Sequence, residues 1–176
     1  TDISDEASKA LADTLAGQAV GVGADISTAA GVAAAIEAGV AAFGGIDLAF
    51  ANAGVECCAA PIAEFSEAEY DRVFNVNVRG AFLTAQAMVN HLTAAGKPGH
   101  ILFTASIAGL QGSPTTSIYN ASKHAVIGVS GGLDSTTGAL VGGLVVGVTE
   151  SLATGYQSDL SFLGRGIGDL APYLVM

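Results

Sequence analysis

The chain has 176 residues, of which 51% are hydrophobic, and a formal net charge of −10 from six basic and sixteen acidic side chains. This length suits one domain with a sizeable core, and the scarcity of Lys and Arg argues against a nucleic-acid partner, because a phosphate-binding surface needs clustered basic groups. Cys57 and Cys58 are adjacent, and His91, His100 and His124 lack metal-ligand spacing and are expected at the surface, so we predict no disulfide framework, no metal site and a reducing cytoplasmic location.

The first part of the sequence alternates helical and extended patterns. Ser4 is placed to cap a helix over residues 4–16, and residues 18–23 follow as a short strand. An alanine-rich helix is expected over residues 28–43, ending at a glycine pair. The apolar run 46–51 is then predicted to be a strand buried on both faces.

The pattern continues beyond a short loop. Ser66 and Glu69 form a capping box that opens a helix running to about residue 95. Residues 100–105 are expected to form the next strand, and residues 117–130 the next helix. Strands separated by helices of this length predict a parallel, doubly wound α/β sheet.

Three side chains near the last helix have the chemistry of a carbonyl-reducing site. Tyr119 and Lys123 are four positions apart, so they share one helix face, where the ammonium favours the phenolate over the phenol. This arrangement lets a tyrosine exchange a proton near neutral pH. Ser106 lies thirteen positions before Tyr119 and behind an apolar run, so it can reach the same place from the end of a strand.

Four motifs in order resemble those of the short-chain dehydrogenase/reductase family. They are Asp25 after an apolar segment, Asn52-Ala53-Gly54 after another, Asn77-Val78-Arg79-Gly80 within a helical pattern, and the set of Ser106, Tyr119 and Lys123. The resemblance covers about residues 1–130. It implies a Rossmann-like doubly wound parallel sheet and an NAD(P)-dependent oxidoreductase that moves hydride between nicotinamide and an alcohol or carbonyl substrate.

The resemblance also implies a role for each catalytic residue. Tyr119 would be the acid/base, and Lys123 would lower the pKa of the tyrosine and hydrogen-bond the nicotinamide ribose. Ser106 would hold the substrate carbonyl, and Asn77 would anchor a water molecule of a proton relay. Each residue also has a structural alternative. Tyr119 would then be a core aromatic and Lys123 a solvated charge. Ser106 would be a turn former and Asn77 a polar helix residue. Together, at the family's spacing, they favour catalysis.

The implied cofactor contacts are Asp2, Asp25, Asn52, Ala53 and Gly54, with Tyr119 and Lys123 shared with the catalytic set. Asp25 would approach the adenine ring, and the Asn52-Ala53-Gly54 motif would support the sheet beside the cofactor. Asp2 stands where a carboxylate accepts hydrogen bonds from the adenosine ribose and repels a 2′-phosphate. NAD is therefore favoured over NADP.

The beginning of the sequence departs from the family pattern. A dinucleotide-binding fold carries a first strand and a glycine-rich loop about twenty residues before the ribose carboxylate, whereas this sequence starts at Thr1, next to Asp2. We therefore expect an incomplete sheet, with the first strand and the loop absent and a strand edge exposed. The chain as written is predicted to be inactive by itself.

The end of the sequence departs as well. Residues 131–176 are apolar and glycine-rich, without charge between Asp134 and Glu150, and their small-xxx-small spacing is typical of membrane helices. This segment resembles the C-terminal part of branched-chain amino acid ABC transporter permeases, although its apolar core is shorter than a bilayer span of ~20 residues. We predict a boundary between a dehydrogenase-like part, 1–130, and this tail. A divergent dehydrogenase ending, or a non-enzymatic chimeric or remnant product, is the alternative.

The resemblance implies the remaining partners. The substrate would be a small alcohol or carbonyl compound. Helices 66–95 and 117 onward would pair across subunits to give a homodimer or homotetramer, and membrane contact would involve only the tail.

Overall fold

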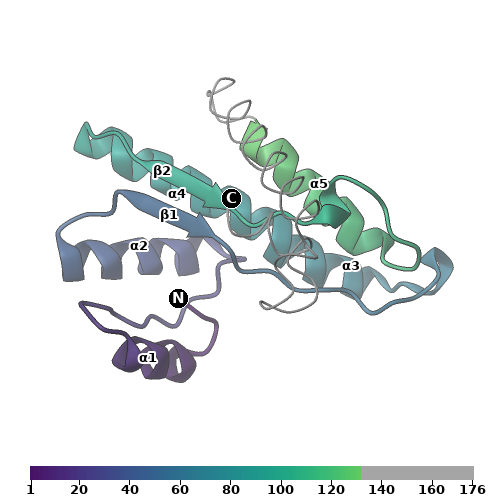
Figure 1. Cartoon of the computed structure of the whole chain (residues 1–176), viewed down its shortest axis with the longest axis horizontal. Helices are drawn as coiled ribbons and strands as arrows, with labels where there is room; N and C mark the ends of the chain where they lie inside the picture. Colours follow the sequence, from purple (N-terminus) through teal and green to yellow (C-terminus); the bar gives the residue numbers. More distant parts are fainter. Residues whose placement is uncertain (132–176) are drawn as a thin grey trace, which may run out of the picture. The chain divides into compact units, whose positions relative to one another are not determined.

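The computed structural model describes residues 1–131, drawn in colour in Figure 1. The chain divides into two compact units, Thr1–Val126 and Ile127–Met176, and of the second unit only residues 127–131 are described. The predicted tail therefore lies outside the described residues, except for Gly131. Within residues 1–131, no helix combines the length and the apolarity needed to cross a bilayer.

The first helix, α1 (Asp5–Thr14), starts as predicted from its cap. The Ser4 hydroxyl accepts a hydrogen bond from the Ala7 N–H at 3.2 Å, which satisfies one of the free amides of the first turn. The helix ends two residues before the predicted position, because Leu15 turns to an extended conformation.

The second helix, α2 (Ala29–Phe43), has the bounds that the sequence indicates. Thr28 caps its beginning, and its hydroxyl accepts a hydrogen bond from an amide of the first turn at 3.0 Å. Gly44 closes the other end with a φ of 78°, a left-handed conformation that glycine adopts without a steric penalty. The alanine-rich pattern was thus sufficient to place this helix.

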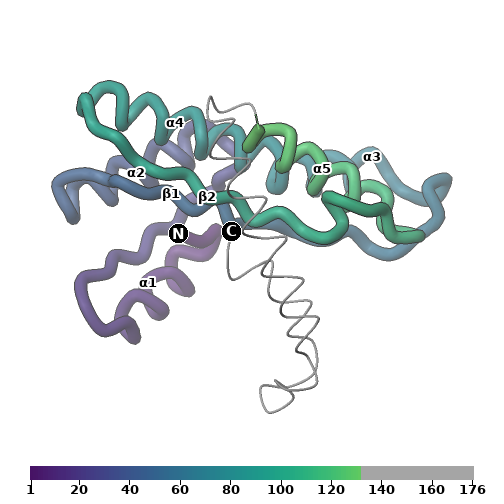
Figure 2. Tube along the Cα trace, turned by 45° about the horizontal axis from the view of Figure 1, so that its top comes forward, coloured from purple at the N-terminus to yellow at the C-terminus, as the bar shows by residue number. Residues whose placement is uncertain are grey.

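The sheet of the described part has two parallel strands, β1 (Leu48–Ala51) and β2 (His100–Phe103). Their register aligns Leu48 with His100 and Ala51 with Phe103. Helix α4 (Gly80–Ala95) packs against both strands and against α2, and Figures 1 and 2 show α4 running beside the strands. The predicted parallel α/β arrangement is confirmed.

Two strand predictions were wrong in detail. The strand expected over residues 18–23 is reduced to a single bridge between Gly23 and Asp2, because among the described residues only Asp2 is available to pair with it. Strand β1 is not buried on both faces, since Leu48 and Phe50 are half exposed. The alanines that alternate with them are more covered, so helices cover only one face of the strand in residues 1–131.

The long helix expected over residues 66–95 is continuous, but its geometry changes in the middle. It consists of α3 (Glu67–Phe74), a π-helical segment over Asn75–Arg79, and α4. Ser66 caps α3 as predicted, with its hydroxyl accepting from the Glu69 N–H at 3.1 Å. The sequence had no signal for the π-helical segment, which contains Asn77.

The remaining elements are short 3-10 turns and one helix. The turns are η1 (Ile62–Glu64) and η3 (Ile107–Gly109), and the helix is α5 (Ser117–Gly131). The core of the first unit is built mainly from α4, α3 and α5, where Met88, Val73 and Val126 are almost completely buried.

Gly31 permits the close approach of α2 to the turn before it, and we expect its replacement by alanine to destabilise the fold. A Cβ at Gly31 would overlap the carbonyl oxygen of Asp25, whereas a Cβ at Gly128 in α5 meets nothing within 4 Å. We expect Gly31→Ala to lower the free energy of unfolding by about 1–3 kcal/mol. Gly128→Ala should raise it by about 0.5–1 kcal/mol. Urea unfolding of both variants checks the prediction, and equal shifts would contradict it.

Candidate active site

Helix α5 carries Tyr119 and Lys123, and the structure brings the two side chains together. The Lys123 Nζ atom lies 5.7 Å from the centroid of the Tyr119 ring and donates a hydrogen bond to the Thr104 carbonyl at 2.9 Å. Lys123 is only 5% exposed, and this burial lowers the pKa of its ammonium group because desolvation disfavours the charged form. A buried cation therefore lies beside a half-buried tyrosine, and the catalytic roles of the two residues stay a prediction.

Asn77 connects the loop after β1 to helix α5. Its Oδ1 atom accepts from the Val55 N–H at 2.8 Å, and its Nδ2 atom donates to the Val55 carbonyl at 2.9 Å. The same Nδ2 donates to the Ser122 hydroxyl at 3.0 Å. Asn77 is 2% exposed, so these contacts fix a buried amide. Its predicted role in holding a water molecule stays a prediction.

Gly54 lies between Asn77 and Lys123. A Cβ atom placed on Gly54 would be 3.4 Å from Asn77 Oδ1 and 3.5 Å from Lys123 Nζ, which is ordinary van der Waals contact. Gly54, Asn77, Tyr119 and Lys123 thus converge from three segments that are distant in the sequence.

Two residues of this network were not identified from the sequence. The Ser122 hydroxyl is fully buried and donates to the Tyr119 carbonyl at 2.8 Å. The Thr104 hydroxyl donates to Asn52 Oδ1 at 2.7 Å, while the Thr104 carbonyl accepts from Lys123. The only available signal was position: Ser122 precedes Lys123 on α5, and Thr104 directly follows β2.

Ser106 stands at the end of β2 and caps the turn η3. Its hydroxyl accepts from the Ala108 N–H at 3.2 Å, and the residue is half-buried. Because parallel strands end at the same edge of a sheet, Ser106 and Asn52 follow neighbouring strands at one edge. The role of Ser106 in polarising the substrate stays a prediction.

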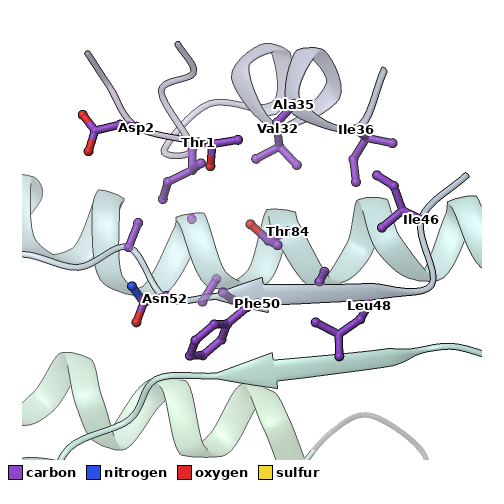
Figure 3. Close-up of a pocket in the computed structure, with 16 residues that line it drawn as sticks. Thr1, Asp2, Val32, Ala35, Ile36, Ile46, Leu48, Phe50, Asn52 and Thr84 are labelled. Atoms are coloured by element: carbon purple, nitrogen blue, oxygen red, sulfur yellow. The ribbon is translucent and has the colours of Figure 1, made fainter. Parts of the chain in front are cut away.

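Three of the predicted cofactor residues line one cavity of about 440 Å³, which we call the strand-edge cavity. Asp2, Asn52 and Ala53 belong to it, and Figure 3 shows the side chains of Asp2 and Asn52 at the same end. The rest of its lining comes mainly from α2, β1 and α4 and is mostly apolar. This cavity separates the Asp2 segment from strand β1.

Asp25 is not among the residues that line the strand-edge cavity. Its Oδ1 atom accepts hydrogen bonds from the Ser27 hydroxyl at 2.7 Å and the Ser27 N–H at 3.0 Å. These bonds lower the pKa of the Asp25 carboxyl, because they stabilise its charged form. In the structure, Asp25 shapes the turn before α2, and its contact with an adenine ring stays a prediction.

The histidines differ from one another in exposure. His100 and His124 are exposed, as predicted for all three. His91 is half-buried instead, because its Nε2 atom accepts a hydrogen bond from the Ile46 N–H at 3.2 Å and so joins α4 to the segment before β1.

We expect Ser122→Ala to weaken the fold through Asn77. The substitution removes an acceptor from the buried Asn77 amide, which should lower the free energy of unfolding by about 1–3 kcal/mol. Ser130→Ala is the matched control, because the Ser130 hydroxyl makes the same kind of bond to a carbonyl three residues earlier on α5. It should change stability by less than about 0.5 kcal/mol. Urea unfolding compares the two, and an equal effect would mean that the bond to Asn77 contributes nothing.

A family model and a curated relative match this chain over most of its length. The family model described as short chain dehydrogenase matches residues 1–153, so the match continues beyond the predicted boundary near residue 130. The 2,5-dichloro-2,5-cyclohexadiene-1,4-diol dehydrogenase of Sphingobium indicum is 36% identical over 129 residues, which are 73% of this chain and 52% of that protein. The chain thus spans about half the length of this relative.

Two solved structures of reductases and dehydrogenases are also similar to this chain. A short chain dehydrogenase/reductase from Burkholderia phymatum in complex with NAD is 40% identical, with a TM-score of 0.67 over 72% of this chain and 46% of that chain. The 3-ketoacyl-(acyl-carrier-protein) reductase from Brucella melitensis, complexed with NADH, is 30% identical, with a TM-score of 0.65 over 89% of this chain and 58% of that chain. The family match, the parallel sheet and the convergence of Asn77, Tyr119 and Lys123 lead to one conclusion: the chain belongs to the short-chain dehydrogenase family.

Proposed function

We propose that this chain supplies the proton-transfer part of an NAD-dependent oxidoreductase that acts on a small alcohol or carbonyl compound. The observation that carries the proposal is the buried Lys123 ammonium, which lies beside the Tyr119 ring, together with the buried Asn77, which is bonded to Ser122 on the same helix. Similar solved structures that contain NAD and NADH support the choice of cofactor.

The residues present fit a nicotinamide ribose. The Lys123 ammonium has three N–H donors, and one of them is bonded to the Thr104 carbonyl, so the others can reach a ribose hydroxyl. When bound, the nicotinamide ring would supply or accept the hydride. Tyr119 would exchange a proton with the substrate oxygen, and Lys123 would stabilise the phenolate formed when that proton leaves. Ser106 would hold the same oxygen by a hydrogen bond.

Asp2 supports NAD over NADP within this proposal. Its Oδ1 atom accepts a hydrogen bond from the Ser4 N–H at 2.8 Å, which orients the carboxylate at the end of the strand-edge cavity. A carboxylate in this place accepts hydrogen bonds from ribose hydroxyls and repels a 2′-phosphate.

We further propose that tight dinucleotide binding requires a strand in the strand-edge cavity. The Asp2 segment pairs with Gly23 on one side, and β1 pairs with β2 on the other. Both pairings are parallel, so one parallel strand between Asp2 and β1 would join them into a single sheet. The loop after such a strand would face the end of the cavity where Asp2 and Asn52 lie. Residues 1–176 by themselves would therefore bind NAD weakly and be inactive.

The test is a calorimetric titration with NAD. The chain of 176 residues is compared with the same chain extended at its N-terminus by a first strand, a glycine-rich loop and a first helix of the pattern that a dinucleotide-binding fold carries. We expect heat of binding only for the extended protein, and loss of that heat when bulky residues replace the loop glycines. Tight binding by the unextended chain would contradict the need for the strand, and no binding by a folded extended chain would contradict the function.

Subunit pairing and location are part of the same proposal. Phe82 and Val89 lie seven positions apart on α4 and are 49% and 42% exposed, so they form an apolar face at helical spacing. Pairing of this face with a second subunit would give the homodimer or homotetramer, in the cytoplasm. The permease-like tail and the non-enzymatic alternative concern mainly residues 132–176, outside the described part of the chain.

A further inference from the structure

The two cysteines of the sequence are neighbours in the loop between β1 and η1. Cys57 is half-buried, Cys58 is exposed, and both are free thiols. Their shared peptide bond is trans, since residues 1–131 contain no cis peptide bond, so their Cα atoms are about 3.8 Å apart. Ordinary disulfides span about 4.4–6.8 Å between Cα atoms. The two sulfurs are therefore better suited to binding one shared atom than to forming a direct disulfide bond with each other.

Hydrogen bonds hold the backbone just before the pair and between its two residues. An Nη2 atom of Arg72 donates to the Glu56 carbonyl at 2.5 Å, and Glu69 Oε1 accepts from the Cys58 N–H at 3.2 Å. Both anchors come from helix α3. With the backbone held, a ligand needs to order only the two thiol side chains.

Arg72 is itself fixed by Glu69, the other residue of α3 that holds this loop. Its guanidinium donates two hydrogen bonds of 2.9 Å to Glu69, and these bonds, with the Cys58 N–H, lower the pKa of Glu69 to about 2. The pKa of Arg72 is raised, mainly by the same bonds to Glu69. Glu69 therefore fixes the guanidinium that holds the Glu56 carbonyl next to Cys57.

We propose that Cys57 and Cys58 form a dithiol site for a soft trivalent centre of the arsenic(III) class, on a backbone that Arg72 and Glu69 hold in place. Thiolates prefer soft centres. Within residues 1–131 no group of three or more His, Cys, Asp and Glu side chains is placed to hold a metal. The trivalent centre therefore takes two sulfur ligands from the protein and carries its third ligand with it, as an organic arsenical does. The proposal is independent of the dehydrogenase function.

The binding step is balanced and involves no oxidant. In its hydrated form the arsenical carries two As–OH groups. Each thiol proton leaves with one hydroxide as water, two As–O bonds break and two As–S bonds form. Arsenic stays in the +3 state, and the cysteines are neither oxidised nor reduced.

The test uses phenylarsine oxide on the full chain, followed by intact mass spectrometry. Because the sequence has no other cysteine, the adduct reports on this pair alone. We expect one phenylarsenic group per chain, stable to excess glutathione and removed by dithiothreitol. In Cys57→Ser and Cys58→Ser, glutathione should remove the adduct. Loss of the wild-type adduct to glutathione, or a glutathione-stable adduct on either single variant, would overturn the proposal.

A second comparison tests the role of Arg72. Arg72→Gln keeps both thiols and removes the bond that holds the Glu56 carbonyl, and the unfolded chain in urea keeps the adjacent thiols without the held backbone. We expect both to react several-fold more slowly than the folded wild type. Equal rates would show that adjacency alone is responsible, and would overturn the assignment of a folded site.

Discussion

Tyr119→Phe is expected to abolish most hydride transfer in the N-terminally extended protein. The substitution removes the hydroxyl that exchanges a proton with the substrate oxygen, and positioned acid/base groups contribute about 10²- to 10⁴-fold to a rate. The ring would remain beside Lys123, so NAD binding should change little. Steady-state kinetics combined with NAD titration therefore separates a lost proton donor from a lost cofactor site.

Tyr70→Phe is the matched control for this prediction. Tyr70 is 47% exposed and stacks on Phe74 with ring centroids 4.3 Å apart, outside the network around Lys123. Tyr70→Phe should leave the turnover number of the extended protein unchanged. If Tyr119→Phe also kept the wild-type turnover number, the proton role of Tyr119 would be wrong, and the buried Lys123 would have only a structural function.

Met88→Ala is expected to have the largest effect on stability. Met88 on α4 is fully buried, in the helix that packs on both strands and on α2. Removal of its side chain loses apolar burial and leaves a cavity, which lowers the free energy of unfolding by about 2–5 kcal/mol. For a domain with a typical stability of about 5–15 kcal/mol, this is a large fraction.

Leu11→Ala is the control, since Leu11 on α1 is 61% exposed and lies outside the proposed subunit contact. Its effect should stay within about 0.5 kcal/mol. Urea unfolding of the wild type and both variants gives the comparison. A loss at Met88 no greater than the loss at Leu11 would contradict the placement of the core beneath α4.

Local patterns were sufficient for most helices. Ser4, Thr28 and Ser66 each start a helix where the sequence indicates, because a hydroxyl at the N-cap bonds to an amide only two or three residues further on. Gly44 ends α2 for an equally local reason. Such contacts lie within one turn of the chain, so a short window of sequence contains both partners.

Strands depended on more distant partners. The apolar run 46–51 was correctly predicted to form a strand, but its burial was not, because exposure of Leu48 and Phe50 depends on what covers the far face of the sheet. The segment 18–23 has strand-like residues, yet a strand forms only where a neighbour supplies a ladder of hydrogen bonds. Among the described residues only Asp2 does so.

The sequence by itself determined the family and most of the helices and indicated Asn77, Tyr119 and Lys123 as candidate site residues, because motif spacing and caps are properties of short stretches. Only the tertiary structure decided how these residues meet: the π-helical segment that carries Asn77, the bond of Asn77 to Ser122, and the bond of Lys123 to Thr104. It also assigned Asp25 to a local turn and Asp2 to a cavity shared with Asn52. The bond of Asn77 to Ser122 joins groups 45 residues apart in the chain. The energies of these arrangements come from burial and from hydrogen bonds between elements, which no local pattern encodes.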